Sequence, residues 1–308
     1  MKTVQLANGI ELQVRDEGPR DAPALIFLHG FPESHRTWRH QIPHLSHRFR
    51  CVAPDQRGYR HSSKPGGPEH YRASLLVGDV FALADALDIG QFTVVGHDWG
   101  GAIAWAVAMA GQPNADPVAA SPHAGRVTRA IIANAPHPAV MQTLLYTDPE
   151  QRAASQYIRV FRDTGNDALI EQGGLLPLLA KAFPDRDSSP RPEAEEQAAL
   201  IEDWSDPERA FGMINWYRAS AMDVPPMDAP FAIPDDAKAI AMPQITIPTL
   251  VIWGMEDRAI RPANLDRLSD HVDDLSITRI ADAGHFVIWE RPEAVNAAMD
   301  GFLGTGER

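Results

Sequence analysis

Six short runs of apolar residues recur along the chain, each followed by glycine, proline or polar residues. Runs that are apolar at every position are typical of strands covered by helices on both faces of a sheet. Helical patterns lie between most of these runs, for example over residues 74–87 and 103–109. This alternation predicts an α/β fold with a mostly parallel, doubly wound sheet. The predicted strands are residues 24–28, 51–53, 92–95, 131–133, 250–253 and 276–280.

The N-terminal segment has a different pattern, since polar and apolar residues alternate over residues 2–16 around Asn8-Gly9. An Asn-Gly pair between two alternating runs predicts a β-hairpin. The segment lacks the apolar stretch of a secretory signal, and the longest apolar run, residues 102–110, is far too short to span a bilayer. The single cysteine, Cys51, excludes an intrachain disulfide. We therefore expect a cytoplasmic protein with no membrane partner.

Residues 136–248 interrupt the alternation of strands and helices. The interval is rich in helical patterns, contains no strong strand pattern, and ends beyond a proline-rich segment at residues 225–234. We predict a core formed by residues 1–135 and 249–308, with residues 136–248 inserted as a helical cap. Residues 112–126 are expected to form a surface loop, whose role the sequence does not indicate.

Composition and charge narrow the functional classes. Hydrophobic residues make up 44% and charged residues 22% of the chain, which excludes wholesale disorder. The 28 lysines and arginines are outnumbered by 41 aspartates and glutamates, so the net charge is −13. Such an acidic chain is a poor candidate for binding phosphate backbones, and we expect no nucleic-acid partner. His40, His44 and His47 have helical spacing, but Pro43 interrupts them, and we expect no metal site.

The residues that carry chemistry follow three of the predicted strands. In doubly wound folds the functional site lies at the carboxyl ends of the strands. Gly96-His97-Asp98-Trp99-Gly100-Gly101 has the small-x-nucleophile-x-small form of a nucleophile elbow, with aspartate in the usual place of serine. Alone, this motif also fits a glycine-rich turn in which Asp98 caps a helix. Asp257 and His285 follow two later strands, and the order nucleophile, acid, histidine is that of α/β-hydrolases.

Motifs along nearly the whole chain resemble those of α/β-hydrolases of the epoxide hydrolase branch. The resemblance implies the α/β-hydrolase fold with an inserted helical cap. It also implies a catalytic triad of Asp98, His285 and Asp257, and no cofactor. The similar motifs are HGFPE at 29–33, WRHQIP at 38–43, APDQRGY at 53–59, SSKP at 62–65, the elbow at 96–101, NWYR at 215–218 and GHFV at 284–287.

The same resemblance extends to the surroundings of the nucleophile. It implies that the backbone N–H groups of Phe31 and Trp99 form an oxyanion hole. Arg60 departs from the family pattern, since glycine is frequent at that place, and residues 112–126 exceed the usual length. The residues expected to line the substrate pocket are Phe31, Pro32, Trp99, His137, Trp216 and Phe286.

An aspartate nucleophile favours a different chemistry from serine. A carboxylate is ionised at neutral pH and can displace a leaving group at a saturated carbon without a base in that step. Asp98 therefore favours opening of an epoxide or cleavage of a carbon–halogen bond, each through an alkyl ester, over esterase, lipase or peptidase chemistry. His285 would then activate water to hydrolyse the ester, with Asp257 orienting the histidine. Glu256 is a rival acid, but its side chain should point away from that of Asp257 if the chain is extended there.

The leaving group distinguishes the two chemistries. An epoxide oxygen leaves as an alkoxide and needs acidic hydrogen-bond donors such as tyrosine hydroxyls. The resemblance implies Tyr217 and Tyr157 for these roles, although helix packing alone also explains Tyr157, and Tyr146 is a second candidate. A halide prefers N–H donors, which leaves a hydrolytic dehalogenase as the alternative. Haloalkane dehalogenases have asparagine at the place of Phe31 and fluoroacetate dehalogenases have arginine at that of Trp99, so each interpretation lacks one part.

The expected partners are a small apolar epoxide and water. A protein that only captures a ligand is disfavoured, because a nucleophile, a base, an acid and polarising groups are all present. The sequence leaves a homodimer open, and it does not specify which epoxide or halogenated substrate is used, nor the regioselectivity and enantioselectivity of the reaction.

Overall fold

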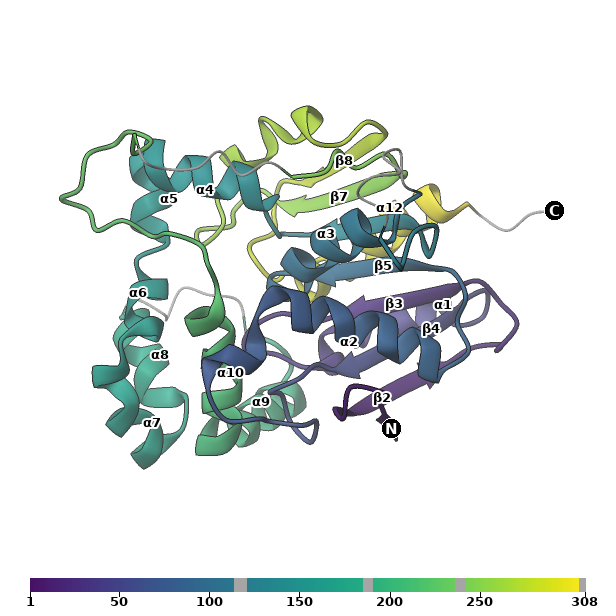
Figure 1. The fold of residues 1–308 in the computed structure, drawn as a ribbon, viewed down its shortest axis with the longest axis horizontal. Coiled ribbons are helices and arrows are strands. Elements are labelled where there is room, and N and C mark those ends of the chain that lie inside the picture. Colours follow the sequence, from purple (N-terminus) through teal and green to yellow (C-terminus); the bar gives the residue numbers. More distant parts are fainter. Residues whose placement is uncertain (114–120, 185–190, 236–241, 305–308) are drawn as a thin grey trace.

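The computed structural model describes residues 1–113, 121–184, 191–235 and 242–304 of the chain. The described strands form one sheet in the order β1-β2-β4-β3-β5-β6-β7-β8 (Figure 1). The pairs β1–β2 and β2–β4 are antiparallel, and every other pair is parallel. The strands are β1 (Lys2–Gln5), β2 (Glu11–Glu17), β3 (Ala24–Leu28), β4 (Arg50–Asp55), β5 (Phe92–His97), β6 (Val127–Ala133), β7 (Thr249–Gly254) and β8 (Leu275–Ile280).

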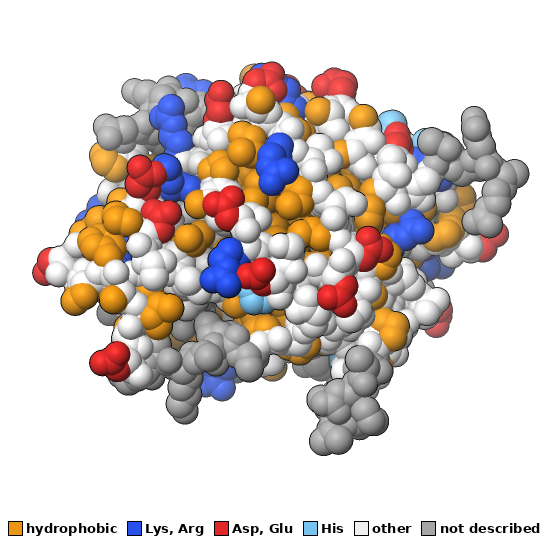
Figure 2. Space-filling view, turned by 90° about the horizontal axis from the view of Figure 1, so that it is seen from above, with side chains coloured by type: hydrophobic (Ala, Val, Ile, Leu, Met, Phe, Trp, Pro, Cys, Tyr) orange, Lys and Arg blue, Asp and Glu red, His pale blue; other side chains and the backbone are white. Residues whose placement is uncertain are grey.

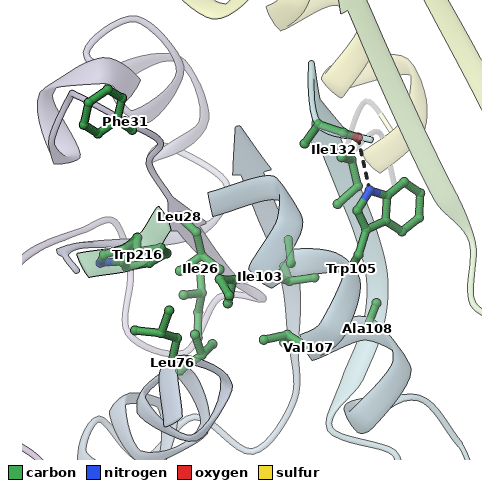
Figure 3. Close-up of a cluster of buried hydrophobic side chains, with 14 of the residues drawn as sticks. Ile26, Leu28, Phe31, Leu76, Ile103, Trp105, Val107, Ala108, Ile132 and Trp216 are labelled. Carbon is green, nitrogen blue, oxygen red and sulfur yellow. Dashed lines mark hydrogen bonds between the residues drawn. The ribbon is translucent and has the colours of Figure 1, made fainter. Parts of the chain in front are cut away.

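Each central strand sends alternate side chains to opposite faces of the sheet, which explains its continuous apolar run. In β3, Ile26 and Leu28 join the core that packs against α2 and α3 (Figure 3). Leu25 and Phe27 of the same strand join a second core, which packs against α1, α11 and α12. These helices are α1 (Gln41–Leu45), α2 (Ala73–Ala86), α3 (Trp99–Gly111), α11 (Val287–Glu290) and α12 (Pro292–Leu303).

The interval between β6 and β7 forms a helical layer beside one end of the sheet (Figure 1). Its described residues contain helices but no named strand, and Ile245 makes one isolated bridge to Val272. This arrangement agrees with the predicted helical insertion, whose boundaries at residues 136 and 248 stay a prediction. The helices of this layer are α4 (Pro138–Thr147), α5 (Pro149–Ala154), α6 (Tyr157–Arg162), α7 (Asp167–Gly173), α8 (Leu176–Ala182), α9 (Ala194–Ser205) and α10 (Pro207–Ala219).

Short 3-10 helices complete the described regular structure. Two of them outside the interval between β6 and β7 contact helices of that interval: η2 (Pro68–Tyr71) contacts α10, and η6 (Pro262–Leu265) contacts α4. The described 3-10 helices are η1 (His35–Trp38), η2 (Pro68–Tyr71), η4 (Thr164–Asn166), η6 (Pro262–Leu265) and η7 (Leu268–Asp270).

The predicted N-terminal hairpin and the six predicted strands are confirmed. The hairpin turns at Asn8-Gly9, where Gly9 has a φ of 83°. Strand β6 begins at Val127, whereas the prediction began it at residue 131. The start was missed because Thr128 and Arg129 interrupt the apolar run there. Part of the predicted loop at 112–126 lies outside the described residues.

Within residues 1–113, 121–184, 191–235 and 242–304, no helix combines the length and apolar character needed to cross a bilayer. The same residues contain no group of three or more His, Cys, Asp or Glu side chains that could hold a metal ion.

Helix α10 lies directly on the core at a point where two glycines meet. A Cβ atom on Gly212 would lie 2.3 Å from the carbonyl oxygen of Gly58, whose own backbone has a φ of 93°. One turn further along α10, the indole of Trp216 donates a hydrogen bond of 2.9 Å to the carbonyl of Arg57. Close backbone approach and this hydrogen bond together determine how α10 presents its buried face to the core.

Arg60 makes a second link between the core and the cap. Its backbone has a φ of 45°, in the left-handed region that favours glycine, which gives a physical reason for the glycine frequent at this place in similar proteins. The guanidinium lies 3.2 Å from the carboxylate of Asp203 in α9 and 3.8 Å from that of Asp55 at the end of β4. The departure from the family pattern therefore adds a charged contact between the two layers.

The substitution Gly212→Ala is expected to destabilise the protein, because the added methyl group meets the Gly58 carbonyl. The expected loss in the free energy of unfolding is about 1–3 kcal/mol, the usual cost of overpacking. Gly78→Ala in α2 is the matched control, since a Cβ atom there meets nothing within 4 Å and alanine is favoured in a helix. Chemical denaturation measures the difference, and a Gly212→Ala protein as stable as the wild type would contradict the assigned contact.

Candidate active site

The chain turns from β5 into α3 at Asp98, whose backbone has φ 51° and ψ −123°. Non-glycine residues rarely adopt a positive φ, so the turn is strained. Small neighbours make it possible, since a Cβ atom on Gly96 would lie 2.4 Å from the Gly100 carbonyl oxygen, and one on Gly100 would lie 2.1 Å from that of Leu28. Asp98 occupies the N-cap position of α3, but its side chain makes no capping hydrogen bond, so its carboxylate is not used to cap the helix.

The imidazole of His285 lies between two carboxylates. Its Nε2 is 3.4 Å from Oδ2 of Asp98, and its Nδ1 is 2.7 Å from Oδ2 of Asp257. Asp98 follows β5, Asp257 follows β7 and His285 follows β8, so the parallel strands bring together groups that are far apart in the sequence. Glu256 is exposed whereas Asp257 is buried, which agrees with the expected opposite orientations of these neighbours.

Asp257 is held by hydrogen bonds on both oxygens. Its Oδ1 accepts from the backbone N–H groups of Ala259 at 2.8 Å and Ile260 at 2.9 Å. Its Oδ2 accepts from Nδ2 of Asn134 at 2.7 Å, and the Asn134 side-chain oxygen accepts from the Gly254 N–H at 2.8 Å. Sequence reasoning missed Asn134 as a site residue, although its position directly after β6 is the signal that could have identified it.

The charges of Asp98, His285 and Asp257, which lie in a row, depend on one another. Burial alone would raise the pKa of Asp98, but the hydrogen bond and charge of His285 hold that pKa below its ordinary value. Burial alone would lower the pKa of His285, but the charge and hydrogen bond of Asp257, followed by those of Asp98, raise that pKa well above its ordinary value. Since each charge stabilises its neighbour, loss of the negative charge on Asp98 would lower the pKa of His285.

A backbone donor contacts Asp98 from the loop after β3. The Phe31 N–H donates a hydrogen bond of 2.7 Å to Oδ1 of Asp98. Gly30 permits this approach, because a Cβ atom there would lie 2.4 Å from that of Asp98. Trp99 is the first residue of α3, where backbone N–H groups lack partners within the helix, but among the described residues no hydrogen bond joins its N–H to Asp98. The structure thus places one of the two predicted donors on the carboxylate.

The two tyrosines that the sequence singled out approach each other near Asp98. Tyr157 is on α6 and Tyr217 is on α10, with their ring centroids 6.1 Å apart. The Tyr217 ring meets those of Phe31 at 5.0 Å and Trp99 at 5.1 Å, both edge to face. Burial, together with the charge of Asp98, raises the pKa of both tyrosines, so their hydroxyls stay protonated and can donate hydrogen bonds.

The rings of Phe31, Trp99, Tyr157 and Tyr217 form an aromatic wall. Two phenylalanines that sequence reasoning missed complete it. Phe161, four residues after Tyr157 on α6, packs against Tyr157, Phe31 and Tyr217 at centroid distances of 5.5, 5.2 and 4.8 Å. Phe183 packs against Tyr157 at 5.0 Å. The helical spacing of Phe161 from Tyr157 is the signal that could have placed it on the same face.

Trp216, Phe286 and His137, which were also expected to line the substrate pocket, have different surroundings. Trp216 lies 6.1 Å from Trp99, ring to ring, and Phe286 lies 5.0 Å from His285. His137 instead packs its ring on His271 at 4.3 Å and on Trp105 at 5.5 Å, and its described ring contacts do not include the aromatic wall. The carbonyl of Pro32 accepts a hydrogen bond from the Trp204 indole, and the Phe31 N–H donates one to Asp98. Tyr146, the second tyrosine candidate, lies on α4.

A second buried pair lies behind the histidine. The Nε2 of His97 donates a hydrogen bond of 2.8 Å to the carbonyl of His285, and burial lowers the pKa of His97 to about 4. Its other ring nitrogen lies 3.9 Å from Glu33, whose pKa burial raises to about 7 against the hydrogen bonds from Thr37 and Trp289. His97 therefore supports the loop of His285 as a neutral ring.

Comparison with known proteins agrees with this geometry. Residues 23–292 match the family described as alpha/beta hydrolase fold. The chain is 32% identical to the AB hydrolase superfamily protein YfhM of Bacillus subtilis, over 96% of this chain and 95% of that protein. It is 30% identical to Epoxide hydrolase 2 of Caenorhabditis elegans, over 98% of this chain and 79% of that protein. This chain belongs to the epoxide hydrolase branch of the α/β-hydrolase superfamily.

Solved structures of epoxide hydrolases extend the likeness to the whole fold. One, from metagenomes of hot environments, is 59% identical with a TM-score of 0.92, and the match covers 98% of both chains. The Bacillus megaterium epoxide hydrolase with a bound inhibitor is 29% identical with a TM-score of 0.79, over 98% of this chain and 99% of that one. Because the matches span 98% of this chain, the likeness to the epoxide hydrolase branch includes the cap helices.

The raised pKa of His285 provides a direct test of the charged row. Asp257→Asn and Asp98→Asn should each lower that pKa, because each removes a negative charge beside the imidazole, and the Asp257 change should have the larger effect. Titration of the imidazole signals by NMR measures the shift. The matched control is Glu256→Gln, which removes an exposed carboxylate next to Asp257. A larger shift in the Glu256 variant would mean that the wrong acid has been assigned.

Proposed function

We propose that the protein hydrolyses small apolar epoxides to vicinal diols, without a cofactor, through an ester between the substrate and Asp98. The observation that carries the proposal is the pairing of a buried carboxylate nucleophile with two protonated tyrosines, Tyr157 and Tyr217, on the facing cap helices. The similarity to epoxide hydrolases over nearly the whole chain supports the same reaction.

In the first step, a carboxylate oxygen of Asp98 attacks a ring carbon of the epoxide. Oδ1 accepts the Phe31 N–H, whereas Oδ2 faces His285, so Oδ2 is the oxygen free to form the new bond. The carbon–oxygen bond of the ring breaks, and its electron pair stays on the epoxide oxygen. Hydrogen bonds from Tyr157 and Tyr217 stabilise that oxygen, which takes a proton from a tyrosine hydroxyl as the alcohol forms. Loss of the Asp98 charge lets His285 release its proton, which reprotonates the tyrosine.

In the second step, water attacks Cγ of the Asp98 ester. Ester formation removes the charge of Asp98, which lowers the pKa of His285, and its neutral Nε2 can accept a proton from water. The negative charge that develops on Oδ1 is stabilised by the Phe31 N–H, and the N–H of Trp99 is the second donor in this proposal. Collapse of the tetrahedral intermediate breaks the ester bond. The departing oxygen takes the proton of the added hydroxyl group, so the diol is released, the Asp98 carboxylate is restored, and His285 keeps the proton that it took from water.

The dehalogenase alternative has less support in this arrangement. A halide would need N–H donors, and the Trp99 ring packs edge to face against the rings of Tyr217 and Trp216, at centroid distances of 5.1 and 6.1 Å. Phe31 contributes a phenyl ring where a halide site would need a further side-chain donor. Halide release from a haloalkane remains the outcome that would favour this alternative.

The substitution His285→Gln should trap the ester, because attack by Asp98 needs no base but hydrolysis of the ester does. After reaction with styrene oxide, mass spectrometry should find the adduct on the peptide that contains Asp98. Asp98→Asn is the control and should form no adduct. An adduct on another peptide, or undiminished steady-state turnover by the His285 variant, would contradict the assigned roles.

The substitutions Tyr157→Phe and Tyr217→Phe should each slow alkylation of Asp98 by an epoxide about 10²-fold, the usual cost of losing one donor to a developing oxyanion. The double variant should be slower still, because no side-chain donor then polarises the ring. Rapid-mixing tryptophan fluorescence measures the alkylation rate.

The Tyr146→Phe variant is the matched control, since Tyr146 is on the neighbouring helix α4, and its alkylation rate should stay close to that of the wild type. Alkylation at the wild-type rate by both single variants, together with loss of halide release in Trp99→Phe, would indicate a dehalogenase.

A further inference from the structure

The two tyrosines reach the site on separate helices that are not consecutive in the chain. Tyr157 begins the short helix α6, and Tyr217 lies near the end of α10. Two hydroxyls can stabilise one epoxide oxygen only if the distance between these helices is held constant. The contacts between α6 and the end of α10 therefore bear directly on the first chemical step.

Arg162, the last residue of α6, spans this gap with its guanidinium group. It donates hydrogen bonds to the carbonyls of Tyr217 at 2.9 Å, Met222 at 2.7 Å and Ser220 at 3.1 Å. These carbonyls lie in and just after the last turn of α10, where helix carbonyls lack partners within the helix. One side chain of α6 thus holds the C-terminal end of the helix that carries Tyr217, including the main chain of Tyr217 itself.

The contact is reciprocated from α10. Arg218, the residue after Tyr217, donates to the carbonyl of Phe161 at 3.3 Å in the last turn of α6, and it also pairs with Asp167. Each helix therefore receives an arginine from the other at its negatively polarised C-terminal end, where a cation is favourable. Arg162 of α6, the helix of Tyr157, therefore holds the end of α10, and Arg218 of α10, the helix of Tyr217, holds the end of α6.

Other polar side chains of α6 hold a different segment. Arg159 donates to the carbonyl of Val224 at 2.9 Å, and Gln156, just before the helix, donates to that of Pro225 at 3.0 Å. Both contacts hold the chain beyond α10, whereas the hydrogen bond to the Tyr217 carbonyl comes from Arg162. Arg159 is therefore a matched reference, because it offers the same side chain to the same layer of the cap.

We infer that Arg162 is a positioning residue for epoxide opening, which fixes the Tyr217 hydroxyl relative to that of Tyr157 by holding the end of α10. The inference rests on the proposed function of the two tyrosines. The acceptors of Arg162 are neutral carbonyls, so its effect on the reaction is geometric and passes through the placement of a hydroxyl. The ester-hydrolysis step uses Asp98, His285 and Asp257 in the core, and it should not depend on Arg162.

The test compares the two chemical steps in Arg162→Met, which keeps the length of the side chain but removes its donors. Alkylation by styrene oxide in single-turnover experiments should slow about tenfold or more, as expected for a small misplacement of a catalytic group. Ester hydrolysis should stay within about twofold of the wild-type rate. Arg162→Lys, which can restore some of the donors, should recover part of the alkylation rate, and it replaces the methionine variant if that protein does not fold.

Arg159→Met is the control and should leave both steps close to the wild-type rates. The decisive comparison combines Arg162→Met with Tyr217→Phe: if Arg162 acts through the Tyr217 hydroxyl, the double variant should alkylate about as slowly as Tyr217→Phe alone. Losses that multiply in the double variant, or equal slowing of both steps in Arg162→Met, would overturn the inference and leave the proposed function intact. Alkylation at the wild-type rate by Tyr217→Phe would instead overturn the proposed function.

Discussion

The positive-φ backbone at Asp98 is the constraint on which the rest of the site depends. Backbone strain of this kind costs on the order of 1–3 kcal/mol and persists only where the surroundings hold it. Here a strand enters the turn, and a helix leaves it with a hydrogen bond of 2.9 Å from the Ala102 N–H to the Asp98 carbonyl. Glycines at 30, 96 and 100 leave room for the neighbouring main chain to close around the turn. The carboxylate is consequently held between the Phe31 N–H and His285, where it has no freedom to turn away.

Asp98 and Asp257, the carboxylates on either side of His285, differ in how many hydrogen bonds their oxygens accept. In the proposed mechanism this difference separates their roles. Both oxygens of Asp257 have close donors, three of them from the main chain or Asn134 and one from His285. Among the described residues, the partner recorded for Oδ2 of Asp98 is the more distant imidazole, at 3.4 Å. A fully hydrogen-bonded carboxylate is a poor nucleophile and a good fixed charge, whereas a partly satisfied one can form a new bond at small cost. Both side chains are buried, so in the proposed mechanism it is hydrogen bonding that distinguishes these two chemically identical groups.

Much of the core could be predicted from the sequence, because a strand covered on both faces is apolar at every position and its polar residues mark the edge where it ends. The same reasoning predicted that Asp98, Asp257 and His285, which each follow a strand, meet at one edge of the sheet. Asn134 was missed because one polar residue after a strand does not by itself reveal which side chain it will contact. The position of His137 depends on packing against His271, more than a hundred residues away, which no local pattern encodes. In the cap, Phe161 and Arg162 have no motif, since their partners are set by how helices pack across the layer.

The division of the site between two layers has an evolutionary consequence. In the proposed mechanism, the groups that hydrolyse the ester belong to loops that follow strands of the sheet, whereas the two hydroxyls that bind the epoxide oxygen belong to helices inserted between β6 and β7. Substitutions in those helices can alter which molecules are admitted without disturbing the shared machinery beneath. New specificities can therefore arise and be lost in lineages that inherit the same core, and substrate preference should diverge faster than reaction type among descendants of one ancestor.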